Sequence, residues 1–367
     1  MTQRERFLAT LRFDEIDRPF FMPTIGFWKE TLERWKHEGL PWYAANEATS
    51  MLYFGFDLWI PLPNGTHEQP GFFPPFAPKV LERKRRHRIV RDFAGKVYKE
   101  FTDGSSSVPL YLESPVKNMD DFRELEWRLR PGFPGRSENP FFDAIHGFAK
   151  LNRHPLGSMF AGLFGFHRHL MGDEELMLAY FDQPELIHAM SRAWLKIVKR
   201  VVRRQKRRYG MDFVSFWEDM CFVNGPLISP RIFREFMTPY YKEAIDAAKN
   251  EGVQFFCVDT DGDCTIVLPL FEEVGVNMMF PFEVQAGMDV RKVRKEHPKL
   301  AVFGGLDKLV LERSREEIEA EVMGKVPEML KSGGYIPALD HTVHPDVPLE
   351  NFRFFLRLLK SRKVWSG

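Results

Sequence analysis

Short runs of apolar and β-branched residues alternate with amphipathic stretches along most of this chain of 367 residues. Helical periodicity is clear in residues 231–249, 289–297 and 315–331, which are bracketed by Gly or Pro. A chain that repeats strand and helix in this order builds a parallel sheet, and eight repeats are typical of a (β/α)8 barrel. We therefore predict an α/β fold, a (β/α)8 TIM barrel, with strands at residues 20–25, 56–61, 156–162, 213–217, 253–258, 276–281, 300–304 and 334–338.

One long gap interrupts this alternation, between the second and third predicted strands. Residues 62–130 are rich in Pro and Gly, and the pattern within 80–102 favours two or three polar strands around a turn at 92–95. Helical patterns follow near 119–127 and 139–150. We predict an insertion of about residues 62–150 above the barrel mouth, within a single domain that spans residues 1–367.

Charge and cysteine content narrow the class of protein. The chain has 52 Lys and Arg against 51 Asp and Glu, a formal net charge of +1. This balance excludes a mainly electrostatic partner, so we expect no nucleic acid and no membrane surface. No apolar run approaches the roughly 20 residues of a membrane span. The three cysteines contain no C-x-x-C pair and cannot form a disulfide framework. We expect a cytoplasmic protein.

Acidic side chains follow most of the later predicted strands at their carboxyl ends. In a TIM barrel these ends surround the active site, so the residues there are the candidates for chemistry. Carboxylates that meet at one mouth raise each other's pKa unless a metal, cations or shared protons compensate. The residues concerned are Glu218, Asp219, Asp259, Asp261, Asp263, Glu283, Asp307 and Asp340, with Lys308 and His341 beside them.

Asp259, Asp261 and His341 form the tightest candidate metal site. Residues i and i+2 of an extended segment point to the same side, so Asp259 and Asp261 can both face the mouth, where His341 follows the eighth strand. Two carboxylates and one imidazole suit Zn, Mn or Fe and leave positions open for substrate or water. The alternative is an ordinary turn, in which Asp caps its own backbone and Gly262 takes a left-handed conformation.

Two cations and an aromatic loop are candidates for binding a substrate. Arg168, after the third strand, and Lys308, after the seventh, can pair with a substrate carboxylate. Trp28, with Phe27 and Trp35, can form an apolar lid, although surplus aromatic residues more often belong to the core. The sequence contains no dinucleotide-binding glycine motif, P-loop or G-x-S-x-G element. This disfavours dinucleotide chemistry, phosphoryl transfer and serine hydrolysis.

Several longer motifs are spread over nearly the whole chain. They are Arg4–Leu11 followed by Asp17-Arg-Pro, Gly225–Pro230, Pro281–Asp289, Phe303–Lys308, Gly333–Val343 and Pro345–Phe352. In these segments the chain resembles the uroporphyrinogen decarboxylase superfamily, which also holds the methylcobalamin methyltransferases. The resemblance implies the superfamily's barrel and does not select one reaction.

Two segments depart from true uroporphyrinogen decarboxylases. Those enzymes carry the loop Met-Arg-Gln-Ala-Gly-Arg-Tyr after the first strand, which binds the substrate's carboxylates, and an essential Asp after the second. Here the first loop, Thr24–Trp35, lacks that motif, and the second strand runs into Leu62 and Pro63. The departures imply that this chain does not act on a tetrapyrrole polycarboxylate.

The methyltransferase branch binds zinc through a His-x-Cys-Gly segment after strand five and a Cys after strand eight, and this zinc activates a thiol. By resemblance, Asp259 stands at the His position and Asp261 at the first Cys, and Gly262 matches. His341 falls at or beside the second Cys position. Ligation by oxygen and nitrogen is less electron-rich than thiolate ligation, so it favours Lewis-acid chemistry over thiol activation.

The resemblance and the strand-end acids together predict a corrinoid-dependent methyltransferase. It would take a methyl group from, or give one to, a corrinoid such as methylcobalamin, carried by a partner protein. One alternative is a metal-independent decarboxylase or lyase of a small carboxylic acid, and another is a non-catalytic corrinoid or small-molecule binder. A homodimer is suggested only because dimers are common in the superfamily. The predicted roles are catalytic for Glu218, Asp219 and His341, substrate-binding for Trp28, Arg168, Glu283 and Lys308, and binding of zinc or another divalent metal for Asp259, Asp261 and His341.

Overall fold

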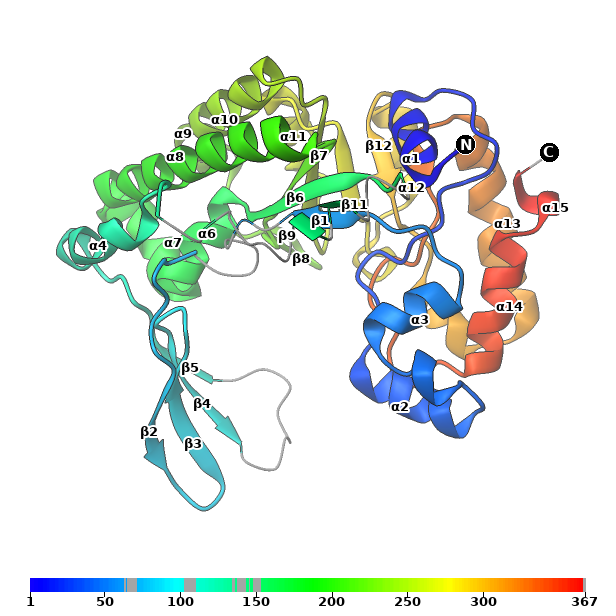
Figure 1. Ribbon diagram of the computed structural model, residues 1–367, viewed down its shortest axis with the longest axis horizontal. Helices are drawn as coiled ribbons and strands as arrows, with labels where there is room; N and C mark the ends of the chain where they lie inside the picture. Colours follow the sequence, from blue (N-terminus) through cyan, green and yellow to red (C-terminus); the bar gives the residue numbers. More distant parts are fainter. Residues whose placement is uncertain are drawn as a thin grey trace.

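Figure 1 shows a curled parallel sheet with helices on its outside and a small antiparallel sheet that projects away from it. The computed structural model describes residues 1–62, 64, 71–101, 110–133, 136, 143–144, 146–147 and 153–365. Within these residues the parallel sheet has seven strands. In spatial order they are β1 (Ile60–Leu62), β6 (Leu156–Ala161), β7 (Phe213–Trp217), β10 (Phe255–Thr260), β11 (Met278–Pro281), β12 (Ala301–Phe303) and β13 (Tyr335–Ile336).

Neighbours in this sheet follow one another in chain order, and every adjacent pair is parallel. Such an order, with crossovers between strands, is the order of a TIM barrel. The predicted α/β class is therefore confirmed, and the described strands form a curled half-barrel.

The first predicted strand, residues 20–25, is not a strand. The segment contacts its neighbours through isolated hydrogen bonds and not through a strand ladder. The Asp57 amide donates to the Phe21 carbonyl (2.7 Å), the Phe21 amide donates to Asp57 Oδ2 (2.9 Å), and the Thr24 hydroxyl donates to the Leu339 carbonyl (2.9 Å). Asp57 precedes β1 and Leu339 follows β13, so the segment lies between the two edges of the sheet. A proline within it lacks the amide donor that a regular ladder needs.

The inside of the curl is filled by side chains from alternate strand positions. Helix α1 (Gln3–Arg12) packs against the same set, and its Phe7 ring lies 5.2 Å from the ring of Phe213. Because Phe213 begins β7, α1 covers the amino-terminal end of the strands and leaves the carboxyl-terminal end for a site. The strand residues of this inner cluster are Phe213, Phe255, Cys257, Met278, Phe280, Ala301, Phe303 and Ile336.

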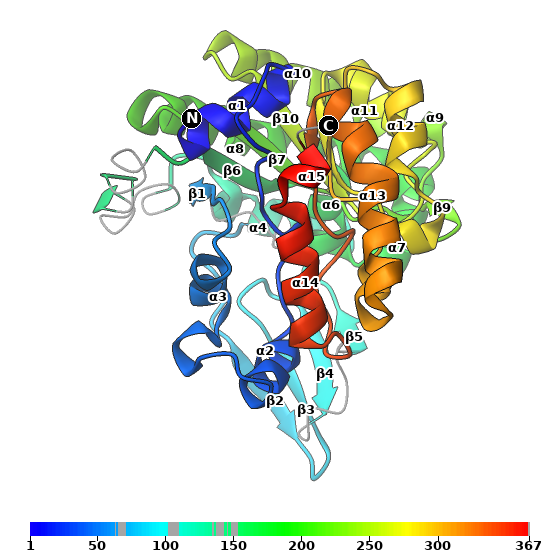
Figure 2. The same ribbon diagram turned by 90° about the vertical axis from the view of Figure 1, so that its right-hand side faces the viewer.

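Helices cover the outer face of the sheet and the amino-terminal region. Figure 2 shows α13 and α14 on one flank of the molecule. None of the described helices combines the length and the apolar character that a bilayer span requires. The helices are α2 (Lys29–His37), α3 (Glu47–Tyr53), α6 (Leu163–Met171), α7 (Asp173–Asp182), α8 (Pro184–Tyr209), α9 (Pro230–Phe236), α10 (Thr238–Asn250), α11 (Leu268–Val274), α12 (Val290–Glu296), α13 (Arg315–Lys331), α14 (Leu349–Leu359) and α15 (Arg362–Trp365), with 3-10 turns η1 (Trp42–Ala44), η3 (Val284–Ala286) and η4 (Lys308–Glu312).

Residues 231–249, predicted as one helix, form two helices, α9 and α10. Helix α9 begins after Ser229, whose hydroxyl accepts a hydrogen bond from the Ile232 amide (3.3 Å). The helix is interrupted at Met237 because Pro239, in the first turn of α10, has no amide hydrogen with which to continue the helical bonding.

An antiparallel sheet lies between β1 and β6 in the chain, in the region 62–150 where we predicted an insertion. It has four strands in the order β2 (Lys79–Arg83), β3 (His87–Arg91), β4 (Val97–Phe101) and β5 (Leu110–Glu113). The first three confirm the strands predicted within 80–102, and β5 lies beyond that range. Helix α4 (Met119–Leu125) and the turn η2 (Glu126–Leu129) follow. Lys96 Nζ lies 3.3 Å from His169 Nδ1 of α6, which ties this sheet to the barrel. The helix predicted at 139–150 lies largely outside the described residues.

Candidate functional site

Three side chains with metal-ligand chemistry meet at the carboxyl-terminal end of the parallel strands. Asp261 follows β10, Glu283 follows β11 and His341 follows β13. One ligand atom from each lies within 4.8 Å of the others. We refer to these three residues as the ligand cluster. Asp261 Oδ2 lies 3.4 Å from His341 Nε2, whereas Asp261 Oδ1 is shielded from solvent and has no hydrogen-bond partner in the described structure.

Strand register brings Asp261 and Glu283 together. Thr260 of β10 pairs with Pro281 of β11, so the residues that follow these strands leave the sheet side by side. The Gly262 amide then donates to Glu283 Oε2 (3.0 Å). Gly262 has a φ of +73°, and a Cβ there would lie 2.6 Å from the carbonyl oxygen of Phe222, in a short antiparallel hairpin of β8 (Cys221–Phe222) and β9 (Gly225–Pro226). Only glycine fits this approach, so the turn that holds Glu283 depends on it.

Local charges compensate one another within the cluster. Lys308 Nζ donates to Glu283 Oε1 (3.0 Å), and both side chains are 18% exposed. Burial opposes ionisation of Glu283, but the hydrogen bonds from Lys308 and Gly262 outweigh it and lower the pKa of this carboxyl. The hydrogen bond to Asp261 raises the pKa of His341, although burial opposes this. Glu283 is therefore ionised and His341 gains a proton more readily than a free imidazole.

Asp340, directly before His341, is fully buried beside the cluster. Its Oδ2 accepts a hydrogen bond from the Val284 amide (2.8 Å), and its Oδ1 accepts one from the Lys308 amide (2.9 Å). Burial raises the pKa of Asp340 to about 6, against these hydrogen bonds. The sequence shows Asp340 among the strand-end acids, but it does not show which backbone amides the carboxylate meets.

Asp259, a predicted metal ligand, is not one of the three clustered residues. It lies in β10 and its carbonyl accepts hydrogen bonds from the amides of Glu218 (2.9 Å) and Asp219 (3.3 Å). Alternation along β10 places its side chain on the inner face, with Cys257. The third member of the ligand cluster is Glu283, which we predicted as a substrate-binding residue, and not Asp259, which we predicted as a metal ligand.

Glu218, a predicted catalytic residue, is fully buried on the helix side of the sheet. Its Oε1 accepts a hydrogen bond from the Leu163 amide and its Oε2 one from the Gly165 amide, both at 3.0 Å, and Tyr241 donates to Oε1. Burial raises the pKa of Glu218 to about 7, against these bonds. The carboxyl group thus binds the first turn of α6 and points away from the ligand cluster. Its catalytic role stays a prediction.

Asp219 and Arg168, predicted as catalytic and substrate-binding residues, are paired with each other. Arg168 donates to Asp219 Oδ2 (2.7 Å) and to the Asp219 carbonyl (2.9 Å). Its guanidinium also lies 5.0 Å from the centre of the Trp217 ring, at the end of β7. The pair lies at the carboxyl-terminal end of the strands, as the ligand cluster does. The guanidinium group of Arg168 already forms an ion pair with Asp219 and is not free to bind a substrate carboxylate.

Trp28, a predicted substrate-binding residue, is 45% exposed and directly precedes α2. Its amide donates to the Val343 carbonyl (3.1 Å), two residues after His341. The other residues of the predicted lid, Phe27 and Trp35, are buried in the core, with their rings 5.5 Å apart. The core interpretation therefore holds for these two, and of the three predicted lid residues Trp28 is the exposed one.

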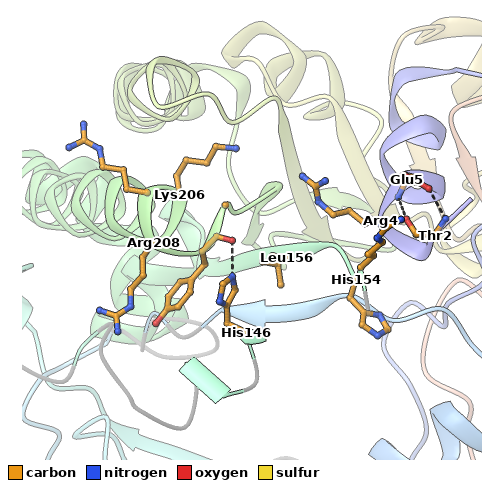
Figure 3. Close-up of a pocket in the computed structure, with 12 residues that line it drawn as sticks. Thr2, Arg4, Glu5, His146, His154, Leu156, Lys206 and Arg208 are labelled. Carbon is orange, nitrogen blue, oxygen red and sulfur yellow. Dashed lines mark hydrogen bonds between the residues drawn. The ribbon is translucent and has the colours of Figure 1, made fainter. Parts of the chain in front are cut away.

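A groove of about 520 Å³ lies at the opposite end of the strands, between α1 and the last turn of α8 (Figure 3). It is lined by Leu156, the first residue of β6, and by several basic residues. His146 Nε2 lies 3.0 Å from the Tyr209 carbonyl within it. No residue of the ligand cluster reaches this groove, and three of its arginines are already neutralised, in the pairs Arg4–Asp212, Arg207–Glu251 and Arg208–Asp143.

Known proteins resemble this chain in sequence and in fold. The model of the family "Uroporphyrinogen decarboxylase (URO-D)" matches residues 100–362. A uroporphyrinogen decarboxylase from Chlorobium phaeobacteroides is 22% identical over 188 residues, which are 50% of this chain and 51% of that protein. One from Synechococcus sp. is 28% identical over 181 residues, 49% of each. The chain thus spans about half the length of the curated relatives it matches.

Among solved structures, a methyltransferase from Methanosarcina mazei superposes with a TM-score of 0.65. The match covers 98% of each chain at 15% sequence identity, so the two proteins share a fold. The family model covers more than half of the chain. This protein therefore belongs to the uroporphyrinogen decarboxylase (URO-D) family.

Proposed function

We propose that this protein is a methyltransferase in which Asp261, Glu283 and His341 bind a divalent metal ion, zinc foremost. The observation that carries the proposal is the convergence of these three side chains within 4.8 Å, with a buried Asp261 oxygen that lacks a hydrogen-bond partner. A buried carboxylate oxygen without a partner is costly, and a cation would remove that cost. Two carboxylates and one imidazole are a donor set that fits Zn, Mn or Fe.

The bound metal would supply Lewis-acid chemistry at a heteroatom of the methyl donor or acceptor. Lys308 keeps Glu283 ionised and therefore able to bind a cation, since its ammonium group lowers the pKa of that carboxyl. His341 must release its proton before its nitrogen can act as a ligand. Trp28 is held near His341 through Val343, and we assign its exposed ring to contact with the substrate.

Methyl transfer to or from a corrinoid, carried by a partner protein, is the reaction we favour. Its support is the motif resemblance to methylcobalamin methyltransferases and the fold shared with the Methanosarcina mazei methyltransferase. In the same proposal, residues 20–25 take the place of an eighth barrel strand, and residues 62–150 are an insertion into the barrel.

The metal-free decarboxylase or lyase is the second candidate, suggested by the names of the curated relatives. It needs a cation for the substrate's carboxylate and would use His341 as general acid or base. Both predicted cations are already engaged, Lys308 with Glu283 and Arg168 with Asp219. A substrate would have to displace one of these carboxylates, so the structure supports this candidate less. A non-catalytic binder would leave the cluster without a role.

Metal content tests the proposal. The wild-type protein is loaded with Zn²⁺, desalted and analysed by mass spectrometry, and we expect about one ion per chain. An Asp261→Ala/His341→Ala variant should retain none. Glu283→Gln should weaken the retention of Zn²⁺, whereas Asp259→Ala should not. The reverse result would favour Asp259, Asp261 and His341, the ligands predicted from the sequence.

The reaction is tested separately, by following the absorbance of free methylcobalamin with a panel of thiols and folates as methyl acceptors. Demethylation that requires the metal-loaded protein supports the proposal. A wild-type protein that holds no metal and demethylates no corrinoid would refute it.

A further inference from the structure

Asp340 connects three loops at the carboxyl-terminal end of the sheet. Its carboxylate accepts one hydrogen bond from the Val284 amide (2.8 Å), after β11, and one from the Lys308 amide (2.9 Å), after β12. Its own amide donates to the Leu306 carbonyl (2.7 Å). The residue itself follows β13 and is fully buried. Asp340 therefore links the loops that follow three neighbouring strands through hydrogen bonds.

The two amides that Asp340 binds belong to the backbone that carries the charged pair of the site. Val284 directly follows Glu283, and Lys308 supplies the ammonium group that lies 3.0 Å from Glu283 Oε1. The next residue after Asp340 is His341. One buried carboxylate thus contacts the backbone of Lys308 and of the residue after Glu283, and directly precedes His341.

We propose that Asp340 is the positioning residue of this site: its two hydrogen bonds hold Glu283 and Lys308 at ion-pair distance and keep Glu283 beside Asp261 and His341. The part of this role that concerns a metal ion rests on the proposed function. The part that concerns the Glu283–Lys308 pair does not, because the hydrogen bond between these two side chains involves no metal ion.

A carboxylate is required for this role because two donors approach from two different loops. Each carboxylate oxygen accepts one of them, and such charge-assisted bonds are stronger than bonds to a neutral acceptor. An asparagine at this position keeps one acceptor and turns an amide NH2 group toward the second donor. Asp340→Asn therefore releases one loop while nearly preserving volume.

The first readout is the environment of Lys308 in the metal-free protein. Reductive ¹³C-methylation labels the lysines for NMR, and a Lys308→Arg variant identifies the Lys308 resonance. In Asp340→Asn we expect this resonance to move toward its position in Glu283→Gln, where the ion pair is removed. An unchanged resonance in folded Asp340→Asn would overturn the proposal.

The second readout is Co²⁺ affinity, measured by absorbance titration against a competing chelator. Loss of a residue that orients metal ligands typically weakens binding about 10- to 100-fold, and we expect a loss in this range for Asp340→Asn. If wild-type protein binds no Co²⁺, the metal proposal fails, while the Lys308 resonance still decides the positioning role. Wild-type affinity in Asp340→Asn would overturn the part of the proposal that concerns the metal.

Two further variants separate positioning from stability. Asp212→Asn is the matched control, since Asp212 is also buried and accepts a backbone bond, from the Leu156 amide (3.0 Å), but at the other end of the sheet. It should lower the melting temperature and leave both readouts unchanged. Val284→Pro removes one donor without touching Asp340, in the first position of a 3-10 turn where proline is tolerated. It should move both readouts in the direction of Asp340→Asn, and it keeps the test available if Asp340→Asn does not fold.

Discussion

Replacing Tyr241 by Phe tests how the buried carboxyl group of Glu218 is stabilised. Tyr241 is fully buried in α10, donates its hydroxyl hydrogen to Glu218 Oε1 and accepts a hydrogen bond from the Leu163 amide (3.3 Å). The substitution removes one donor from a carboxyl group that no water reaches. The Leu163 amide retains its bond to Glu218, so the main loss is the bond from Tyr241.

The expected destabilisation depends on pH, because a hydrogen bond to a charged group contributes roughly 1.5–3 kcal/mol and a neutral one about 1 kcal/mol. Burial raises the pKa of Glu218 to about 7 in the folded protein. This exceeds the value in the unfolded chain, so the cost of ionising Glu218 is absent below the unfolded pKa and fully present above about pH 7. We expect Tyr241→Phe to lower the free energy of unfolding by about 2 kcal/mol at pH 8.5 and about 1 kcal/mol at pH 5.5.

Urea unfolding followed by tryptophan fluorescence at the two pH values measures this difference. Tyr335→Phe is the matched control, since the buried Tyr335 hydroxyl donates to a neutral acceptor, the Gly304 carbonyl (3.0 Å). That variant should lose about 1 kcal/mol at both pH values. Equal losses for Tyr241→Phe at pH 5.5 and pH 8.5 would show that Glu218 does not change its ionisation in this range, and the reasoning would be refuted.

Two further predictions concern the packing beside Glu218 and the pH dependence of the site. In Gly162→Ala the new Cβ would lie 2.2 Å from the Glu218 carboxyl carbon, so we expect a loss of about 1–3 kcal/mol in thermal or urea unfolding. Gly324→Ala, in α13 with nothing within 4 Å of the new Cβ, should instead stabilise by about 0.5–1 kcal/mol; equal effects of the two variants would contradict the packing argument. Co²⁺ affinity should fall as the pH drops through the pKa of His341, which the bond to Asp261 raises, because a protonated imidazole cannot bind a metal. A titration whose pH dependence is unchanged in His341→Ala would exclude this residue as the titrating ligand.

The order of strands and helices could be predicted from the sequence because the spacing of apolar residues differs between a strand and a helix. Six of the eight predicted strands and the helices α12 and α13 are found close to the predicted ranges, and a seventh, predicted at 56–61, overlaps β1 at residues 60 and 61 alone. A proline interrupts the backbone hydrogen bonding of a helix or strand without changing the pattern of apolar residues. The pattern then predicts a longer helix or strand than the backbone forms. This explains both the absence of a strand at residues 20–25 and the division of 231–249 at Met237, two residues before Pro239.

The members of the site were harder to predict because they depend on which face of a strand each residue occupies. In β7, Phe213 points inward while Val214 and Phe216 point toward the helices, yet both faces are apolar. Strands of a parallel sheet buried on both sides lack the polar and apolar alternation that would reveal their orientation. The sequence therefore does not show that Glu218 turns toward α6 and away from the mouth.

By itself the sequence determined that strand-end acids and His341 would gather at one end of a parallel sheet, because carboxyl ends of parallel strands share an edge. The tertiary structure alone decided that Glu283 joins Asp261 and His341, because this depends on the register of β10 against β11 and on the turn at Gly262. It also decided the contacts of Asp340, whose donors come from residues 284 and 308. Contacts between side chains that are far apart in the sequence depend on how the elements pack. They cannot be predicted from the local pattern of residues.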